Sequence, residues 1–586
     1  MGPRVKRLWA FFQRFLRHRR QLVAGFVCIP AAQLLDVAIT VVIGKTLDRL
    51  QSASDTDFLL GIVAIIMGLS LVRGVFRYLQ RWWLVVVSRW VENELKQDLF
   101  DKLVSLPLSF HAASRSGDVV SRVTSDVENV RMFLGPGMMY TLGALVMVPV
   151  SMGLLFSIDA PLAATMLVPL VLMGLGMKAF TPRIHKWSQA VQESLAEIGH
   201  RAQENFGGIR VVKGYGREES QVVRFEKASH TNRDNQILLG RSRGITHALT
   251  HGANDFTFVV ILVVGGMAMI DRRMAAGDLF QFIDLTFKVF WPIIAVGWIA
   301  GMYPRALASA VRIDELLERQ SDLVEPAAPK PLEPVRGAIS LRDVSYAYPK
   351  TDTPAISGLT IDLPAGSVLG IVGPTGSGKT TTLLLLARMM DPATGSVRID
   401  GTDLRETTLA QIRSALGYVP QDSFLFSDTW RDNVSFGLEA PIEDARLVRL
   451  AEEVCMTEEV AQFPKGFDQR IGERGVTLSG GQRQRTCIAR ALAREPRILV
   501  LDDALSAVDT ETESKLVANL RAAGRGRTVV IAAHRLSSVV AADLVVVLGR
   551  DGRVEAQGRH ADLAARPGWY RDTWQRQQAR DELSVL

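Results

Sequence analysis

The stretch GPTGSGKTT, residues 373–381, follows an apolar run at residues 367–372 and precedes a helix-forming run at residues 383–388. It matches G-x-x-x-x-G-K-[ST], in the strand, glycine-rich loop and helix order that this pattern requires. Glycines allow the backbone to wrap closely around a phosphate and to turn successive N–H groups toward it at the positive end of a helix. Lys379 is placed to reach the β- and γ-phosphates, and the hydroxyl of Thr380 to bind Mg²⁺. The stretch predicts a nucleoside triphosphate site formed by Gly373, Thr375, Gly376, Ser377, Gly378, Lys379, Thr380 and Thr381.

Three further segments carry groups suited to the same site. ILVLDD, residues 498–503, is an apolar strand that ends in acids, and its Asp502 is placed to hold Mg²⁺. In YAYP, Tyr348 offers an aromatic face for a base, although a tyrosine that simply belongs to a strand fits equally well. In VPQDSFLFSDT, Gln421 is a neutral group that can touch both the metal and an attacking water. The predicted metal ligands are thus Thr380, Gln421 and Asp502.

A second phosphate-binding element lies in the same half of the chain. LSGGQ, residues 478–482, precedes a helix-forming run at residues 483–492. A serine and two glycines at a helix N-terminus form an anion site. One nucleotide does not easily need both elements from one chain.

Composition points to a membrane protein of more than one domain. The chain has 586 residues, of which 48% are hydrophobic, and a formal net charge of +7; its mean hydropathy is +0.14. Basic residues crowd the N-terminus directly ahead of an apolar segment, which favours a membrane flank over a nucleic-acid site. They are Arg4, Lys6, Arg7, Arg14, Arg17, Arg19 and Arg20. The three cysteines show no metal-ligand spacing.

Six segments approach the ~20 apolar residues that cross a bilayer. They are residues 22–43, 58–76, 138–158, 163–180, 256–270 with an extension on its N-terminal side, and 280–302. The long segments after the second and fourth spans are rich in Arg and Lys, so the positive-inside rule places both termini in the cytoplasm. Residues 8–16 predict an amphipathic helix along the membrane surface. No cleavage site follows that would indicate a signal peptide.

The two long polar segments, residues 81–134 and 182–243, are compatible with helices that continue beyond the membrane. Structureless loops of this length would be unusual. We therefore expect the helices to turn back within residues 110–127 and 207–225.

Ionisable residues also lie in or near the apolar spans. They are Asp36, Arg73, Arg77, His251, Asp255, Asp284 and Lys288. Intramembrane charges are costly and often functional, but ion pairs between helices explain any single one equally well. Asp36, Asp255, Asp284 and Lys288 are candidates for lining a cavity.

The predicted domain organisation has four parts. Residues 1–20 form a surface segment and residues 21–316 a transmembrane domain of six helices with long cytoplasmic extensions. Residues 317–337 form a proline-rich linker, and residues 338–586 an α/β nucleotide-binding domain with a P-loop.

The C-terminal half resembles the nucleotide-binding domain of ABC transporters, and the whole chain resembles a bacterial ABC exporter half-transporter. The resemblance rests on LSGGQ together with the phosphate loop, Gln421, SAVD at residues 506–509 and His534 in IAAHRLSS. RIGERG, residues 470–475, and SGDVVSRVTSDV, residues 116–127, also resemble exporter segments. The family pairs two nucleotide domains head to tail, with each ATP between the phosphate loop of one and the signature of the other. This implies a second half-transporter as partner, a hydrophobic or amphipathic substrate, and no nucleic acid.

The resemblance also assigns roles to residues. It gives Tyr348 the adenine, Gln421 the γ-phosphate and coupling to the membrane helices, and His534 closure on the γ-phosphate. Asp509 would link the two sites. The signature residues that would meet the partner's ATP are Ser479, Gly480, Gly481 and Gln482.

One position departs from the family pattern. The catalytic glutamate that follows the metal-binding aspartate is replaced by Asp503. Its carboxylate falls short of the attacking water by about 1 Å, and misplacement on that scale costs ~10²-fold in rate. The expectation is a heterodimer in the inner membrane whose partner supplies a glutamate. A homodimer with slow hydrolysis and an ATP-gated channel or regulatory subunit stay open as alternatives.

Overall fold

A computed structural model describes residues 3–50, 56–349, 351, 353–472, 475, 477–522 and 526–585. Glu473 and Arg474, in the exporter-like stretch before the signature, lie outside the described residues, as do residues 51–55 of the first loop. The side chains of Arg4 and Lys6 in the basic N-terminal cluster are likewise not described.

The chain forms two compact units. The helical unit comprises Met1–Val104 and Ser116–Arg319, and the sheet unit comprises Ser105–Arg115 and Gln320–Leu586. The chain therefore passes between the units three times. The short segment Ser105–Arg115, which the sequence division at residues 21–316 includes in the transmembrane domain, belongs with the sheet unit.

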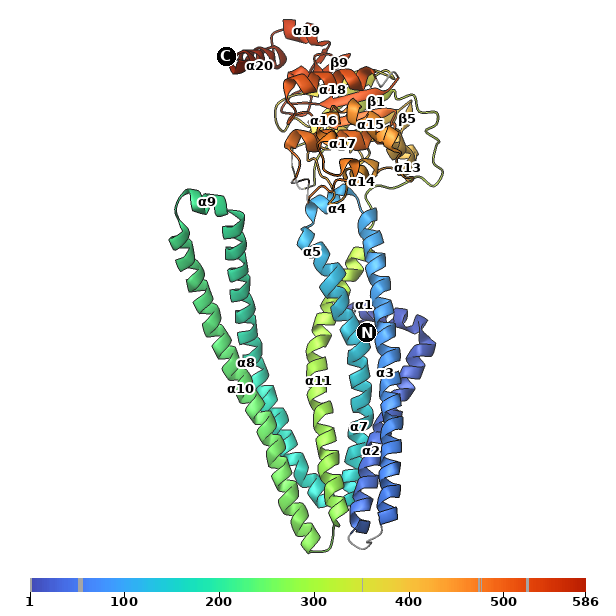
Figure 1. Ribbon diagram of the computed structural model, residues 1–586, viewed down its shortest axis with the longest axis vertical. Helices are drawn as coiled ribbons and strands as arrows, with labels where there is room; N and C mark the ends of the chain where they lie inside the picture. Colours follow the sequence, from blue (N-terminus) through green and yellow to red (C-terminus); the bar gives the residue numbers. More distant parts are fainter. Residues whose placement is uncertain are drawn as a thin grey trace. The chain divides into compact units, whose positions relative to one another are not determined.

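The described part of the helical unit contains seven long helices and three short ones of six residues each. They are α1 (Pro3–Arg17), α2 (Arg19–Leu50), α3 (Thr56–Ser105), α5 (Ser116–Ser121), α6 (Val127–Met132), α7 (Met138–Ile158), α8 (Ala160–Gly207), α9 (Ile209–Gly214), α10 (Glu218–Ile270) and α11 (Ala276–Leu317). Two π-helical turns, η1 (Arg122–Asp126) and η2 (Phe133–Gly137), flank α6. Helices α8 and α10 run side by side and are connected through α9 (Figure 1).

Six described helices are long and apolar enough to cross a membrane, which confirms the predicted number of spans. Helices α3, α8 and α10 have 50, 48 and 53 residues, far more than the ~20 that a bilayer requires. The expected continuation beyond the apolar segments is therefore present, and α4 (Leu108–Ala113) and α9 lie at the expected turns. Many apolar side chains of α3 are exposed, as expected for a lipid-facing helix, among them Leu60, Met67 and Leu71.

The sheet unit contains two sheets. Four antiparallel strands have the order β2-β1-β4-β5. They are β1 (Ile339–Tyr346), β2 (Ile356–Leu363), β4 (Thr394–Ile399) and β5 (Thr402–Asp403). The second sheet has the order β10-β9-β3-β8-β7-β6 and is parallel except for β10, which pairs antiparallel with β9. Its strands are β3 (Val368–Val372), β6 (Leu416–Val419), β7 (Ile498–Asp502), β8 (Thr528–Ala532), β9 (Leu544–Leu548) and β10 (Val554–Gly558).

The strands β3, β7 and β8 are buried along their whole length, which explains their continuous apolar sequences. Helices cover the sheets and complete two apolar cores. They are α12 (Lys379–Leu386), α13 (Leu409–Ala415), α14 (Trp430–Ser435), α15 (Asp444–Glu453), α16 (Thr457–Ala461), α17 (Gly480–Ala493), α18 (Thr510–Ala522), α19 (His560–Ala565) and α20 (Trp569–Val585). Short 3₁₀ turns are η3 (Leu404–Glu406), η4 (Gly466–Asp468) and η6 (Leu536–Val539).

Candidate functional site

The parallel sheet brings the predicted groups to one edge. Parallel strands end at the same side of a sheet, which is where α/β proteins bind ligands. The phosphate loop follows β3, Gln421 follows β6, Asp502 ends β7 and His534 follows β8. Asp502 pairs in register with Ala532 of the adjacent strand. Segments separated by more than a hundred residues thus converge because the strands carrying them are neighbours.

The phosphate loop needs glycine at its two ends. Gly373 has φ +154° and Gly378 has φ +92°, backbone conformations that residues with a side chain rarely adopt. A Cβ at Gly373 would lie 2.4 Å from the carbonyl oxygen of Leu548, and one at Gly378 would lie 2.5 Å from that of Ala355. The loop therefore takes this path only with glycine at both positions.

Lys379 and Thr380 begin α12 and face the end of β7. The ammonium of Lys379 donates to the carbonyl oxygens of Gly373 and Pro374 at 2.9 and 3.1 Å, and burial lowers its pKa. The hydroxyl of Thr380 donates to Oδ1 of Asp502 at 3.0 Å. Burial raises the pKa of Asp502, which is 3% exposed. A hydroxyl and a carboxylate this close match the oxygen ligands that Mg²⁺ prefers.

Ser377 shows that the loop fits a phosphate group. Its side chain is fully buried, and Oγ has no hydrogen-bond partner within the described part of the chain. A buried hydroxyl left without a partner is costly. A phosphate oxygen in the loop would accept from this hydroxyl, so the residues fit ATP with Mg²⁺.

A cavity of about 760 Å³ extends from the loop. It is lined by residues that the sequence singled out, namely Tyr348, Thr375, Gly376, Ser377, Gly378, Lys379, Thr380, Thr381, Gln421 and His534. Tyr348 lies just past β1, its hydroxyl is 3.1 Å from Oγ1 of Thr381, and it is 39% exposed. Its ring packs edge-on against Tyr346. The cavity therefore offers a phosphate end and an aromatic side chain, as a nucleotide requires.

Asp503 lies directly after β7 with a left-handed backbone, φ +47°. Its backbone N–H donates to the carbonyl oxygen of Ala532 at 2.9 Å, and the N–H of His534 lies 3.4 Å from its Oδ1. The carboxylate is half-buried. Asp503 is thus oriented by the loop that carries His534.

The signature segment lies outside this cavity. Ser479 caps α17: its hydroxyl accepts from the N–H of Gln482 at 3.2 Å, and Oε1 of Gln482 accepts from the N–H of Ser479 at 2.9 Å. Gly480 and Gly481 form the first turn of α17. The structure therefore does not bring Ser479, Gly480, Gly481 and Gln482 together with this chain's own phosphate loop.

The segment that carries SAVD is anchored separately. Asp509 caps α18 by accepting from the N–H of Thr512 at 2.9 Å. Gln484, buried in α17, accepts from the N–H of Ala507 at 2.9 Å and donates to Oγ of Ser506 at 3.1 Å. Sequence reasoning missed Gln484, although its position two residues after the signature was a usable signal.

Other residues near the site were also missed. Tyr418 of β6 faces Asp502, and burial together with that carboxylate raises the pKa of Tyr418. Arg550 and Arg553 line the cavity from the turn between β9 and β10. The side chain of Gln577, in α20, hydrogen-bonds to the backbone of His534 and Leu536 in the loop after β8. These residues come from segments without a phosphate-binding pattern, so only the fold identifies them.

Charged residues of α2, α3 and α11 form an ion-pair cluster in the helical unit. Asp36 is buried and pairs with Arg73, with Arg77 at 3.4 Å and with Lys288 at 3.5 Å. Lys288 also pairs with Asp284 at 2.8 Å. The sequence allowed two interpretations of these charged residues, lining of a cavity or ion pairing between helices. Asp36 and Lys288 have both roles.

Asp36 and Lys288 line a cavity of about 670 Å³ together with Arg77 and Arg81. Asp255 and Asp284 are not among its lining residues. Asp255 and His251 are exposed on α10.

The two units match two families along the chain. Residues 22–293 match the ABC transporter transmembrane region, and residues 356–506 match the ABC transporter family. A probable multidrug resistance ABC transporter ATP-binding/permease protein of Bacillus subtilis is 30% identical over 98% of this chain and 97% of its own length. The chain belongs to the ABC transporter family.

Other relatives narrow the type of ABC transporter. An ATP-dependent lipid A-core flippase of Photobacterium profundum is 30% identical, over 96% of each chain. The solved structure of a bacterial Atm1-family ABC exporter with ATP bound matches with a TM-score of 0.79 and 26% identity, covering 95% of this chain and 99% of that one. This ABC transporter chain is therefore an exporter half-transporter that binds ATP with Mg²⁺ and couples ATP hydrolysis to transport.

Proposed function

We propose that this chain is one subunit of an asymmetric ABC exporter, in which the ATP site on its own phosphate loop hydrolyses slowly. The observation that carries the proposal is Asp503, which directly follows β7. A glutamate there would place its carboxylate one methylene further from the backbone. The shorter side chain leaves about 1 Å to the water, and such a misplacement costs ~10²-fold in rate.

The residues around Asp503 act on binding and orientation. When bound, ATP would supply the phosphoryl group that water attacks, and Mg²⁺ would neutralise the charge that develops on it. Lys379 and the loop N–H groups would hold the phosphates, Thr380 and Asp502 the metal, and Tyr348 the base. Gln421 and His534, which follow the two strands next to β7, would orient the water and the γ-phosphate. Among these groups only the carboxylate of Asp503, which would take the proton from the water, is too short.

The signature segment supports a second subunit. The capping box between Ser479 and Gln482 leaves the first turn of α17 regular, and the side chain of Ser479 is exposed. An intact signature on this chain completes the ATP site of a partner. A partner with a glutamate at the position of Asp503 would therefore contain the active site of the pair.

The test is ATPase activity of the full chain in nanodiscs, as wild type and as Asp503→Glu. We expect wild type to be nearly inactive alone. A rise of ~10²-fold with Asp503→Glu would show that the missing methylene limits hydrolysis in a self-paired chain. If both are inactive, the chain does not form a productive pair with itself and needs a partner. Ordinary turnover by the wild type alone would refute the proposal.

Asp362→Glu is the matched control, because it adds the same methylene to an exposed aspartate of β2 that pairs with Arg342 at 2.8 Å. It should leave turnover unchanged. Two alternatives have their own outcomes. Equal, slow hydrolysis in a stable self-dimer would favour a homodimeric exporter, and ATP-dependent ion current without accumulation of substrate would favour a channel.

We further propose an anionic amphipathic substrate. In and beside the 670 Å³ cavity, four cations (Arg73, Arg77, Arg81 and Lys288) outnumber two carboxylates (Asp36 and Asp284). Apolar and aromatic groups such as Met139, Tyr140 and Trp291 line the rest of the cavity. Intramembrane charges of this kind mark substrate pathways. With both termini in the cytoplasm of a bacterium, as the basic segments favour, transport would run outward across the inner membrane.

Flipping of labelled phosphatidylglycerol and labelled phosphatidylcholine by proteoliposomes tests the charge preference. The pair of variants is Lys288→Gln, in the cavity, and Asp255→Asn, an exposed residue outside it. We expect Lys288→Gln to reduce the preference for the anionic lipid and Asp255→Asn to keep it. Equal transport of both lipids by the wild type would remove the charge argument.

A further inference from the structure

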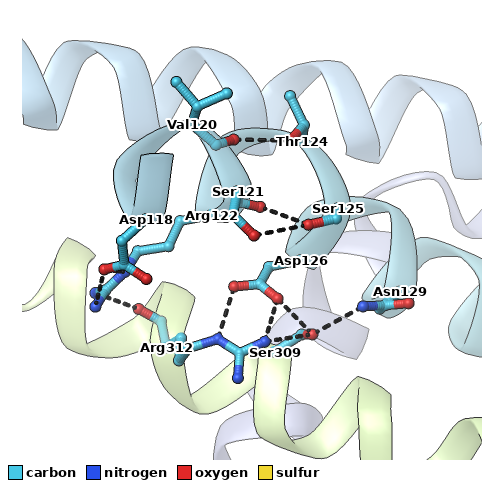
Figure 2. Close-up of polar contacts among 10 residues, drawn as sticks. All are labelled: Asp118, Val120, Ser121, Arg122, Thr124, Ser125, Asp126, Asn129, Ser309 and Arg312. Carbon is cyan, nitrogen blue, oxygen red and sulfur yellow. Dashed lines mark hydrogen bonds and ion pairs between the residues drawn. The ribbon is translucent and has the colours of Figure 1, made fainter. Parts of the chain in front are cut away.

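A polar cluster around the buried Asp126 joins two segments of the helical unit that are far apart in sequence, and the side chain of its main partner, Arg312, is 44% exposed (Figure 2). Asp126, at the end of η1, is 2% exposed. Its Oδ2 accepts from Nε of Arg312 at 2.8 Å, and its Oδ1 accepts from Nη2 of the same residue and from the hydroxyl of Ser309 at 2.8 Å. Nδ2 of Asn129 donates to Oγ of Ser309 at 3.2 Å. Asp126 is therefore fully hydrogen-bonded by α11.

The π-helical turn explains how Asp126 reaches α11. A π-turn adds a residue to the helix and leaves carbonyl groups displaced from their usual partners. The hydroxyl of Thr124 donates to the carbonyl oxygen of Val120 at 2.7 Å, and that of Ser125 to the carbonyl oxygen of Ser121 at 3.0 Å. Figure 2 shows the bond between Thr124 and Val120 on the side of the turn away from Arg312. Consecutive hydroxyl residues thus stabilise a turn that directs the next side chain, Asp126, toward α11.

The two segments joined by the cluster are also the segments through which the chain connects the helical unit to the sheet unit. The chain leaves the sheet unit at Arg115 and enters α5, η1 and α6 directly; it returns to the sheet unit after Arg319, just past the end of α11. Any displacement of the ATP-binding unit is therefore delivered through the covalent chain to both segments. The bond between Asp126 and Arg312 ties these two connections to each other.

A contact that only held the two segments together would not need a charged, bidentate hydrogen-bonded pair. Burying a carboxylate is costly unless it is paired and hydrogen-bonded, and Asp126 is buried while its partner Arg312 reaches it from a half-exposed position. The two parallel N–H donors of Arg312 instead fix direction as well as distance, as bidentate arginine–carboxylate pairs do. A second bond, from Nη1 of Arg122 to the carbonyl oxygen of Arg312 at 3.3 Å, holds the same register.

We propose that Asp126 and Arg312 are positioning residues that couple ATP binding to the membrane helices, by making the segment from α5 to α6 and the end of α11 move together. Without the pair, each segment follows the sheet unit on its own. The nucleotide site then still binds ATP, but the response of the helical unit is weakened. The inference does not depend on the heterodimer or on the substrate.

The experiment is hydrogen exchange of the full chain in nanodiscs, with and without Mg–ATP, together with the affinity for a fluorescent ATP analogue. The variants are Asp126→Asn, Arg312→Gln, the double variant and Arg312→Lys. In the wild type, Mg–ATP should change exchange in peptides from residues 116–137 and 300–317. Asp126→Asn and Arg312→Gln should reduce this ATP-dependent change at least three-fold while ATP affinity stays within two-fold.

Two comparisons separate coupling from mere folding. The double variant should be no worse than either single variant, because both remove one interaction, and Arg312→Lys, which keeps the charge with a single donor group, should lie between wild type and Arg312→Gln. Glu197→Gln is the matched control, since it breaks the ion pair with Arg201 at 2.6 Å inside α8 alone. It should behave as the wild type.

The proposal is overturned if Asp126→Asn retains the full ATP-dependent change, or if ATP affinity is lost together with it. Additive effects in the double variant would also overturn it. So would a wild-type helical unit whose exchange does not respond to Mg–ATP. If Asp126→Asn does not fold, Arg312→Lys and Arg312→Gln give the same decision.

Discussion

Gln577 of α20 should control how firmly the loop after β8 is held. Its Oε1 accepts from the N–H of Leu536 at 2.9 Å, and its Nε2 donates to the carbonyl oxygen of His534 at 3.1 Å. The two bonds hold the backbone groups on either side of Arg535. One side chain from the C-terminal helix therefore holds the backbone on both sides of the loop that contacts Asp503.

The expected magnitude follows from these two bonds. Each neutral hydrogen bond contributes about 1 kcal/mol net, so Gln577→Ala should lower the free energy of opening the loop by about 2 kcal/mol. A tenfold change in an equilibrium corresponds to about 1.4 kcal/mol, so the amide of Leu536 should exchange ~30-fold faster. Gln577→Glu keeps the acceptor but loses the donor, and should accelerate exchange about five-fold.

Hydrogen exchange of peptides covering residues 534–539 measures this directly, without requiring turnover. Gln578→Ala, at the exposed neighbouring position of α20, is the control and should exchange as the wild type. If Gln577→Ala exchanges within two-fold of that control, the loop is held by its packing, and the proposed role of Gln577 is wrong.

Two further predictions concern the phosphate and metal groups. Burial raises the pKa of Asp502, so the folded, metal-free protein favours the protonated carboxyl. The resulting contribution to stability is present at low pH and is lost as the pH rises through the raised pKa. Mg²⁺ binds the ionised carboxylate. On acidification, the affinity for Mg–ATP relative to ATP alone should therefore begin to fall at a higher pH than it would with an aspartate of ordinary pKa. Binding titrations from pH 7 downward measure this. Gly373→Ala places a Cβ 2.4 Å from Leu548 O, whereas Gly376→Ala meets open space at φ +84° and costs only the left-handed strain of about 1–2 kcal/mol. The loss of ATP-analogue affinity should therefore be much larger at Gly373, and equal losses would contradict the steric argument.

The sequence predicted the fold wherever a local pattern has one structural solution. The phosphate loop needs the strand before it and the helix after it, so β3 and α12 were predictable, and apolar length alone indicated the six spans. The convergence of Gln421, Asp502 and the phosphate loop also followed, because each ends or follows a buried strand.

What sequence reasoning missed depends on contacts between distant segments. Gln577 is one of several glutamines in a polar helix, and nothing local distinguishes it from Gln578. Asp126 belongs to a segment that resembles exporter segments, but the π-turn that directs it toward Arg312 produces no recognisable hydrophobic pattern in the sequence. The contact could therefore not be predicted. Pro136 lies inside a second π-turn, so even a residue that usually ends helices did not mark an end here.

The three passages of the chain between its units limit how the protein can be divided. A fragment that starts at Gln320 would contain every nucleotide-binding residue but lack Ser105–Arg115, which belongs to the same compact unit. In the full chain Leu106 is 6% exposed, and the hydroxyl of Ser109 donates to Asp322 at 3.3 Å. An isolated C-terminal fragment would leave uncovered the surface that this insertion contacts. Soluble expression of the ATP-binding part should therefore improve when the eleven-residue insertion is supplied as a fused or added peptide.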